Sequence, residues 1–328
     1  MAKPLIEVRN LKMYFPVGSS LLASHRKTLK AVDDVSFDLY PGETFGLVGE
    51  SGCGKTTVGR TLVRLYKPTA GQIIFDGTDI ARMDEHTVLP YRKKMQMIFQ
   101  DPYASLNPRM TVSSIIGEPM RLQGVKQEEI SARVSELIEQ VGLKKDHLNR
   151  YPHEFSGGQR QRIGIARSLA VKPKFVVCDE AVSALDVSIQ SQIINLLKDL
   201  KDQQNLTYLF ITHDLSVVKY ISDRIGVMYL GNIVELADAQ ELFDHPYHPY
   251  TEALMNAIPT TDVDSGREIQ ILEGDIPSPV NPPAGCKFHT RCKYCTEICK
   301  HQIPQWREIS PNHFVACHHI LGGEEETK

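Results

Sequence analysis

Residues 49–56 decide the fold, and they read Gly49-Glu50-Ser51-Gly52-Cys53-Gly54-Lys55-Thr56. They fit the phosphate-binding pattern G-x-x-x-x-G-K-[ST]. The apolar run 44–48 before them predicts a short buried strand, and the apolar spacing over 57–65 predicts a helix. Strand, glycine-rich loop and helix in this order form the context that the pattern requires. The sequence therefore predicts a phosphate-binding loop (P-loop) within an α/β fold.

The residue types of this loop explain its chemistry. Glycines let the backbone approach phosphates and direct its N–H groups at them. The N-terminus of the following helix adds roughly half a positive charge. We expect Lys55 to reach the β- and γ-phosphates of a bound triphosphate and the Thr56 hydroxyl to bind Mg²⁺.

Length and composition limit the class of protein. A chain of 328 residues with 41% hydrophobic and 23% charged residues is typical of a soluble globular protein with one large domain and an appendage, or with two domains. The formal net charge of −3 provides no basic field for nucleic acid. No apolar run is long enough to span a bilayer, and the N-terminus lacks the apolar core of a signal peptide. We therefore expect a cytosolic protein.

Strands and helices alternate along the chain. Strands are expected at 5–10, 29–39, 44–48, 71–77, 95–100, 174–180 and 207–214, with a closing hairpin at 225–235. Helices are expected at 112–141, 160–170, 188–201 and 217–221. This alternation predicts a parallel sheet that binds ligands at the carboxyl ends of its strands. After Ala237 proline and short loops dominate, so a boundary is expected near 236–240.

Polar side chains follow several of the predicted strands. Asp179 is expected to hold the Mg²⁺ shell, and Glu180 to take a proton from the attacking water or to polarise it. His213 could contact a γ-phosphate, although an isolated histidine is more often structural. Gln100 could contact the attacking water or the metal.

A second anion-binding helix end is expected at Ser156-Gly157-Gly158-Gln159, directly before the helix at 160–170. A serine hydroxyl and backbone N–H groups converge there on a positive helix end. The plain alternative is an ordinary helix cap. Because the P-loop helix already holds one triphosphate, this second end is a candidate for a nucleotide held by a partner.

Together these motifs resemble the ATPase subunits of ABC transporters. The resemblance rests on the P-loop, Gln100, FSGGQ at 155–159, FVVCDE at 175–180, SALD at 183–186 and His213, in the order and spacing of that family. It implies an α/β P-loop ABC ATPase domain at 1–236, with an antiparallel β subdomain and a helical subdomain at about 101–158, followed by a C-terminal extension at 237–328. It also implies two such subunits paired head to tail, with each ATP between one P-loop and the other subunit's SGGQ.

The resemblance implies a role for each matching residue. Phosphate contacts fall to Gly49, Ser51, Gly52, Cys53, Gly54, Lys55, Thr56 and Thr57. Contacts across the dimer fall to Ser156, Gly158, Gln159 and Asp186. Glu180 is the catalytic base, and His213 is the γ-phosphate sensor. Gln100 contacts Mg²⁺ and water together with Thr56 and Asp179. Gln100 also connects the site to the helical subdomain, which is expected to move. The adenine is expected to stack on Phe15, with Tyr14 as the alternative.

Further stretches resemble the oligopeptide/dipeptide importer branch of that family. They are QDPYASLNPR at 100–109, LDVSIQ at 185–190, HPYHPYT at 245–251 and GCKFHTRC at 285–292. This resemblance implies an ATPase at the cytoplasmic face of the membrane that powers import of di- and oligopeptides. The implied partners are a sister ATPase in a heterodimer, two membrane permeases and an extracytoplasmic peptide-binding protein.

Three other functions are alternatives to peptide import. Related branches import nickel or other small solutes. A soluble ABC ATPase of DNA repair or translation is the second alternative, but the long coiled coil or the double cassette of those classes is missing from this sequence. A sensor module with a vestigial ATPase is the third, and the intact Glu180 and His213 argue against it.

Five of the seven cysteines are gathered near the C-terminus, at Cys286, Cys292, Cys295, Cys299 and Cys317. In a reducing compartment such clustering indicates a metal centre more than a disulfide framework. Four thiolates suit zinc or an iron–sulfur cluster, and thiols that bind no metal are the third alternative. The branch pattern falls on Cys286, Cys292, Cys299 and Cys317, leaves Cys295 aside and implies a 4Fe–4S cluster.

Overall fold

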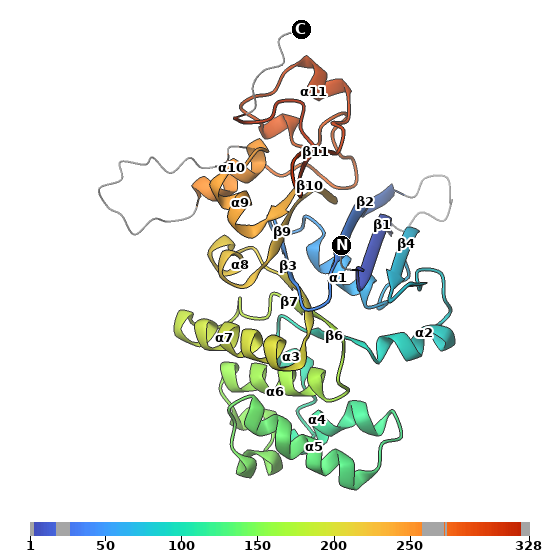
Figure 1. The fold of residues 1–328 in the computed structure, drawn as a ribbon, viewed down its shortest axis with the longest axis vertical. Helices are drawn as coiled ribbons and strands as arrows, with labels where there is room; N and C mark the ends of the chain where they lie inside the picture. Colours follow the sequence, from blue (N-terminus) through green and yellow to red (C-terminus); the bar gives the residue numbers. More distant parts are fainter. Residues whose placement is uncertain (1–2, 18–26, 258–271, 273, 323–328) are drawn as a thin grey trace, which may run out of the picture. The chain divides into compact units, whose positions relative to one another are not determined.

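The computed structural model describes residues 3–17, 27–257, 272 and 274–322 (Figure 1). These residues form two compact units. We call the described residues of Tyr40–Glu43 and Met83–Ile211 the helical unit. The P-loop unit consists of the described residues of Lys3–Leu39, Thr44–Arg82 and Thr212–Lys328. The P-loop and the paired carboxylates Asp179 and Glu180 therefore belong to different units.

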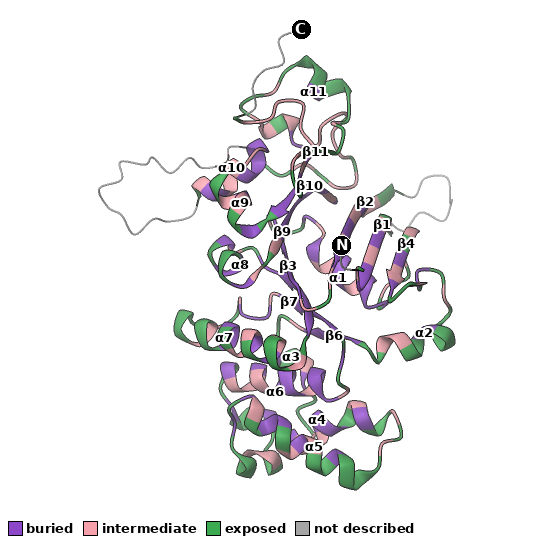
Figure 2. Cartoon of the chain, viewed as in Figure 1, coloured by how far each residue is buried: buried purple, intermediate pink, exposed green. Residues whose placement is uncertain are grey.

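The P-loop unit contains an antiparallel sheet and a second group of paired strands. The antiparallel sheet has the order β2 (Lys27–Leu39), β1 (Ile6–Val17), β4 (Ala70–Phe75) and β5 (Thr78–Asp79). In the second group β3 (Thr44–Val48) pairs in parallel with β9 (Arg224–Tyr229), and the order continues with β10 (Asn232–Asp238), β12 (His313–Val315) and β11 (Arg307–Ser310). Every residue of β3 is buried, as its apolar sequence predicts (Figure 2).

Short helices connect these strands. They are α1 (Lys55–Leu62), α8 (Leu215–Ile221), α9 (Ala239–Asp244), α10 (Pro249–Asn256) and α11 (Glu297–His301). Local sequence sets where they begin: the Asp214 carboxylate accepts the N–H groups of Ser216 and Val217, and Pro249 occupies the first turn of α10. None of the described helices combines the length and the apolar composition needed to cross a membrane.

The helical unit is built around three parallel strands. β7 (Phe175–Asp179) lies between β8 (Thr207–Ile211) and β6 (Met95–Ile98). The helices are α2 (Glu85–Arg92), α3 (Pro102–Ser105), α4 (Val112–Arg121), α5 (Gln127–Gln140), α6 (Gly157–Leu169) and α7 (Val187–Gln204). The predicted alternation of strand and helix is confirmed in this unit.

The structure corrects several predicted elements. The helix expected at 112–141 is two helices, because the chain turns at Gly124, whose φ of 75° is readily adopted only by glycine. The first strand continues to Val17 instead of ending at Asn10, since bulges in its pairing with β2 absorb the irregular sequence near Asn10. Helix α10 and the strands β11 and β12 were not predicted.

The extension packs into the core of the P-loop unit. Strand β12, which follows the expected boundary near 236–240, pairs with β10, which begins before that boundary. The extension therefore adds strands to the sheet of the preceding domain. Phe288 of the extension is 2% exposed and lies 5.2 Å from the ring of Tyr229 and 5.3 Å from that of Tyr250. These three aromatic rings attach the cysteine-rich segment to strand β9.

Replacing Phe288 by alanine is expected to lower the free energy of unfolding by about 3–5 kcal/mol, because it empties a ring-sized volume in this core. Chemical denaturation with far-UV circular dichroism would measure the change. Tyr294→Ala is the matched control, since the Tyr294 side chain is 38% exposed and should lose little. Equal losses in the two variants would contradict the packing described.

Candidate functional site

Close backbone contacts fix the shape of the P-loop. A Cβ at Gly49 would lie 2.1 Å from the Met228 carbonyl oxygen, and one at Gly54 would lie 2.1 Å from the Ala31 carbonyl oxygen. Gly54 also has a φ of 111°, in the region that favours glycine, and caps α1. The loop therefore needs glycine at both positions, and the expected order of strand, loop and helix is present.

Lys55 points into the loop. Its buried ammonium donates hydrogen bonds to the carbonyl oxygens of Gly49 at 2.6 Å and Glu50 at 3.0 Å. Thr56 and Thr57 are half-buried in the first turn of α1. The other predicted phosphate contacts differ in exposure, because Ser51 and Gly52 are exposed whereas Cys53 is buried.

The two candidates for adenine stacking differ in their surroundings. Tyr14 is held by a hydrogen bond from its hydroxyl to Asp33, and burial together with this carboxylate raises its pKa. Phe15 makes an edge-to-face contact with Tyr66, whose hydroxyl accepts a hydrogen bond from Arg60 of α1. Phe15 thus lies near the helix that begins at the P-loop, and its ring carries no hydrogen bond that stacking would break.

His213 belongs to the same unit as the P-loop. It is exposed and lies between Thr212 and helix α8. The Thr212 N–H donates to the carbonyl oxygen of Leu47, two residues before Gly49, at 3.3 Å. The segment carrying His213 therefore leaves the same end of β3 as the P-loop does.

The helical unit brings Gln100 and Glu180 together. The Gln100 amide donates a hydrogen bond of 2.7 Å to the Glu180 carboxylate. Asp179 is buried at the end of β7, and Glu180 follows with a φ of 46°, held by its N–H to the Ile211 carbonyl oxygen at 2.9 Å. The carboxylate of Glu180 is half-buried, so water can reach it.

The predicted second anion site is a helix cap in this structure. The Ser156 hydroxyl accepts the Gln159 N–H, and the Gln159 side chain accepts the Ser156 N–H, which forms a capping box at the start of α6. Gly158 allows a close approach of α7, because a Cβ there would lie 2.5 Å from Ile189. Asp186 caps α7 through the Ile189 N–H at 2.9 Å. Ser156 thus serves the helix, and anion binding by this end would depend on the free N–H groups of its first turn.

The four cysteines of the branch pattern line one small cavity of about 10 Å³, and Cys295 does not line it. Burial raises the pKa of Cys292 to about 11 and that of Cys317 to about 12, so both thiols are protonated at neutral pH. Among the described residues, no group of three or more histidine, cysteine or acidic side chains is arranged to hold a metal ion. The structure therefore gathers the four predicted ligands around one cavity.

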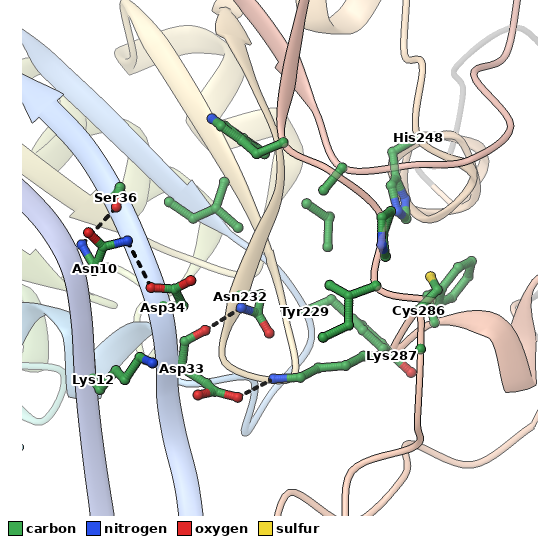
Figure 3. A pocket seen from close by; sticks show the side chains of 18 residues that line it. Asn10, Lys12, Asp33, Asp34, Ser36, Tyr229, Asn232, His248, Cys286 and Lys287 are labelled. Atoms are coloured by element: carbon green, nitrogen blue, oxygen red, sulfur yellow. Dashed lines mark hydrogen bonds and ion pairs between the residues drawn. The ribbon is translucent and has the colours of Figure 1, made fainter. Parts of the chain in front are cut away.

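A larger cavity of about 460 Å³ lies between the antiparallel sheet and the extension, within the P-loop unit (Figure 3). Lys287 crosses it to reach Asp33 at 3.0 Å, and Asn10 donates to Asp34 at 3.0 Å. His248 also lines it, and burial lowers the pKa of His248 to about 4, so its ring is neutral. This volume is within the range of small-molecule pockets, and no motif in the sequence predicted the cavity.

Sequence reasoning also missed a contact between the P-loop and the extension. The Arg291 guanidinium donates to both carboxylate oxygens of Glu50, at 2.7 and 3.0 Å. The Glu50 N–H donates to the Tyr250 hydroxyl at 2.9 Å. The only available signals were an acidic residue within the loop motif and an arginine directly before Cys292, and neither identifies a pair 241 positions apart.

Comparisons with known proteins extend over nearly the whole chain. A family model described as ABC transporter matches residues 32–183, and one described as oligopeptide/dipeptide transporter, C-terminal region, matches residues 234–299. The oligopeptide transport ATP-binding protein AppF of Bacillus subtilis (strain 168) is 56% identical, over 96% of this chain and 97% of its own length. A putative peptide import ATP-binding protein of Brucella ovis is 54% identical, over 96% of this chain and 97% of its own.

Solved structures show the same fold over the ATPase part. The dimeric ATP-binding cassette MJ0796, in a post-hydrolysis state with ADP and Pi, matches with a TM-score of 0.64 and 26% identity. The match covers 71% of this chain and 98% of that chain. The mixed α/β fold around a P-loop is therefore confirmed.

Proposed function

The chain belongs to the ABC transporter family, and we propose that it is the ATP-hydrolysing subunit that powers import of di- and oligopeptides. One observation carries this proposal. The ATPase model and the model of the peptide-transporter C-terminal region both match the same chain, and relatives named for oligopeptide or peptide transport align over almost its full length. Nickel import and a non-transport ATPase are not favoured, because the relatives compared above are named for peptides.

The P-loop unit supplies the nucleotide-binding side of the proposed mechanism. Lys55 and the N–H groups of residues 49–57 would bind the phosphates, and the Thr56 hydroxyl would hold Mg²⁺. Phe15 is the preferred stacking partner for adenine, since the Tyr14 hydroxyl is engaged by Asp33. His213 contacts the γ-phosphate.

The helical unit supplies the hydrolytic side. Glu180 takes a proton from the attacking water, and Gln100, which is already hydrogen-bonded to Glu180, orients that water or the metal. Gln100 is followed directly by the loop that leads into α3 and α4. A change in the contact between Gln100 and Glu180 is therefore passed to the helices that we propose as the contact surface for the permeases.

The proposed assembly would account for a second candidate anion-binding helix end in the same chain. Ser156, Gly158, Gln159 and Asp186 would face the ATP held by the P-loop of a second subunit. We propose a sister ATPase as that subunit, with two permeases and an extracytoplasmic peptide-binding protein completing the transporter. The chain then lies peripherally on the cytoplasmic face of the membrane and has no nucleic-acid partner.

Substrate uptake tests the transport assignment. Cells that lack this chain are expected to lose uptake of radiolabelled di- or oligopeptides and to regain it when the chain is supplied. Nickel uptake, measured in the same cells, should not change. Loss of nickel uptake with normal peptide uptake would contradict the proposal.

We also propose a 4Fe–4S cluster bound by Cys286, Cys292, Cys299 and Cys317. Four thiols around one cavity are the donor set that such clusters use. The cavity has room for about one water, so the thiols would move apart and release their protons on loading. The cluster would hold together segments of the extension, and no step of ATP hydrolysis requires it.

Metal analysis separates the three alternatives for these cysteines. Anaerobically purified protein is expected to be brown, to absorb broadly near 400 nm and to contain about four irons and four sulfides per chain. Cys292→Ser should lose the iron, whereas Cys295→Ser, the matched control outside the cavity, should keep it. One zinc per chain, or no metal, would overturn the cluster and leave the ATPase assignment intact.

A further inference from the structure

A carboxylate within the P-loop is paired with a cation from the extension. The Arg291 guanidinium donates hydrogen bonds to both carboxylate oxygens of Glu50. This bidentate geometry makes guanidinium–carboxylate pairs strong. The Arg291 side chain is only 4% exposed and that of Glu50 is 24% exposed, so solvent screens the pair weakly. The guanidinium of an arginine is always charged in proteins.

A second contact reaches the loop from the same segment. Lys287 donates to the carbonyl oxygen of Leu230 at 2.9 Å and to Asp33 at 3.0 Å (Figure 3). The next residue, Gly231, donates its N–H to the carbonyl oxygen of Cys53 in the P-loop at 2.9 Å. Lys287 follows Cys286 directly and Arg291 precedes Cys292 directly, so the chain between two cavity-lining cysteines is connected to the loop at both ends.

We propose that Arg291 is a positioning residue for the P-loop, and that through it the order of the cysteine-rich segment sets the affinity for ATP. This inference rests on the proposed ATPase function. Arg291 does not touch the reacting atoms. It fixes Glu50, and with it the loop backbone whose N–H groups bind phosphate.

The charge of Glu50 gives the pair its effect on nucleotide binding. An unpaired carboxylate beside the phosphate-binding loop would repel the anionic triphosphate, and poor access to water would strengthen that repulsion. Arg291 neutralises the carboxylate and holds it in one orientation. Loss of Arg291 therefore combines electrostatic repulsion with a looser loop, and both effects weaken ATP binding.

A double-mutant cycle on the chain, purified together with the proposed sister ATPase, tests this account. Arg291→Ala is expected to weaken the binding of a fluorescent ATP analogue about tenfold and to raise KM for ATP by a similar factor. The kcat should change less than about twofold, because Gln100 and Glu180 are untouched. Adding Glu50→Gln to Arg291→Ala should restore most of the affinity, since the repelling charge is gone.

Lys293→Ala is the matched control. Lys293 lies two residues from Arg291, pairs with Glu252 at 3.0 Å, and has a side chain that is 50% exposed. It should leave the affinity for ATP unchanged. If Arg291→Ala binds ATP as wild type does, the positioning role is refuted. If Glu50→Gln restores no affinity in the double variant, the repulsion by an unpaired Glu50 carboxylate is refuted.

The same binding assay, which needs no ATP turnover, tests whether the order of the cysteine-rich segment affects ATP affinity through Arg291. Cys292→Ser is expected to weaken binding as Arg291→Ala does, and the double variant should be no weaker than Arg291→Ala alone. If the losses of ATP affinity in the two single variants add up in the double variant, the effect of Cys292 does not pass through Arg291, and this part of the proposal is refuted. Failure of the wild-type chain itself to bind ATP would instead refute the proposed function, so the two failures are distinguishable.

Discussion

Replacement of Glu180 by glutamine is expected to slow ATP hydrolysis by about 100-fold or more while ATP still binds. The glutamine keeps the size of the side chain and can still meet Gln100, whose amide lies 2.7 Å from the Glu180 carboxylate. It cannot accept a proton from water. The nucleotide therefore stays intact, and the two ATPase subunits are expected to remain closed on it.

The measurement combines single-turnover hydrolysis of radiolabelled ATP with size-exclusion chromatography in Mg²⁺ and ATP. The variant should retain ATP and elute as the paired species, whereas wild type should separate after hydrolysis. Glu128→Gln, an exposed change in the first turn of α5, is the matched control and should turn over normally. Normal turnover by Glu180→Gln would refute Glu180 as the base.

Replacement of Lys55 by alanine is expected to lower the affinity for ATP by about 100-fold. The variant loses an ammonium that the loop holds among its carbonyl oxygens, within 3.0 Å of Gly49 and Glu50. Bound phosphates would receive hydrogen bonds from that ammonium, and hydrogen bonds to charged groups are the stronger class. Lys55 is the single lysine of the loop motif at residues 49–56, so the motif offers no replacement for it.

Equilibrium binding of a fluorescent ATP analogue checks this expectation, with the melting temperature recorded to confirm that the variant folds. Lys67→Ala is the matched control, because Lys67 is exposed and lies in the same unit after α1. Its affinity should match that of wild type. Unchanged affinity in Lys55→Ala would contradict the assigned role.

Local sequence was enough to predict the P-loop and the strand before it. The conformations of Gly49 and Gly54 and the burial of 44–48 follow from residue types that are adjacent in the chain. The family motifs likewise identified Gln100 and Glu180, which the structure places in contact although 80 positions separate them. Their strands β6 and β7 are neighbours, and alternating patterns predict such parallel strands without giving the register.

Contacts between distant polar residues could not be predicted in the same way. Nothing in the chain near Glu50 specifies Arg291 as its partner, because ion pairing depends on how the extension folds back on the P-loop unit. The break in the helix expected at 112–141 depended on a single glycine, Gly124, which the apolar spacing on both sides obscured. For the Ser156 hydroxyl the sequence leaves an anion ligand and a helix cap open; the structure shows a capping box, and anion binding stays a prediction.

The central claim is that this chain couples ATP hydrolysis to peptide import, and a reconstituted transporter tests it most directly. The chain, the proposed sister ATPase and both permeases would be placed in proteoliposomes, and ATP hydrolysis would be measured with and without the peptide-loaded binding protein. We predict that the loaded binding protein stimulates hydrolysis, that peptide accumulates inside the vesicles, and that Glu180→Gln abolishes both. An equal rate of ATP hydrolysis with and without the loaded binding protein, together with no accumulation of peptide, would contradict the claim.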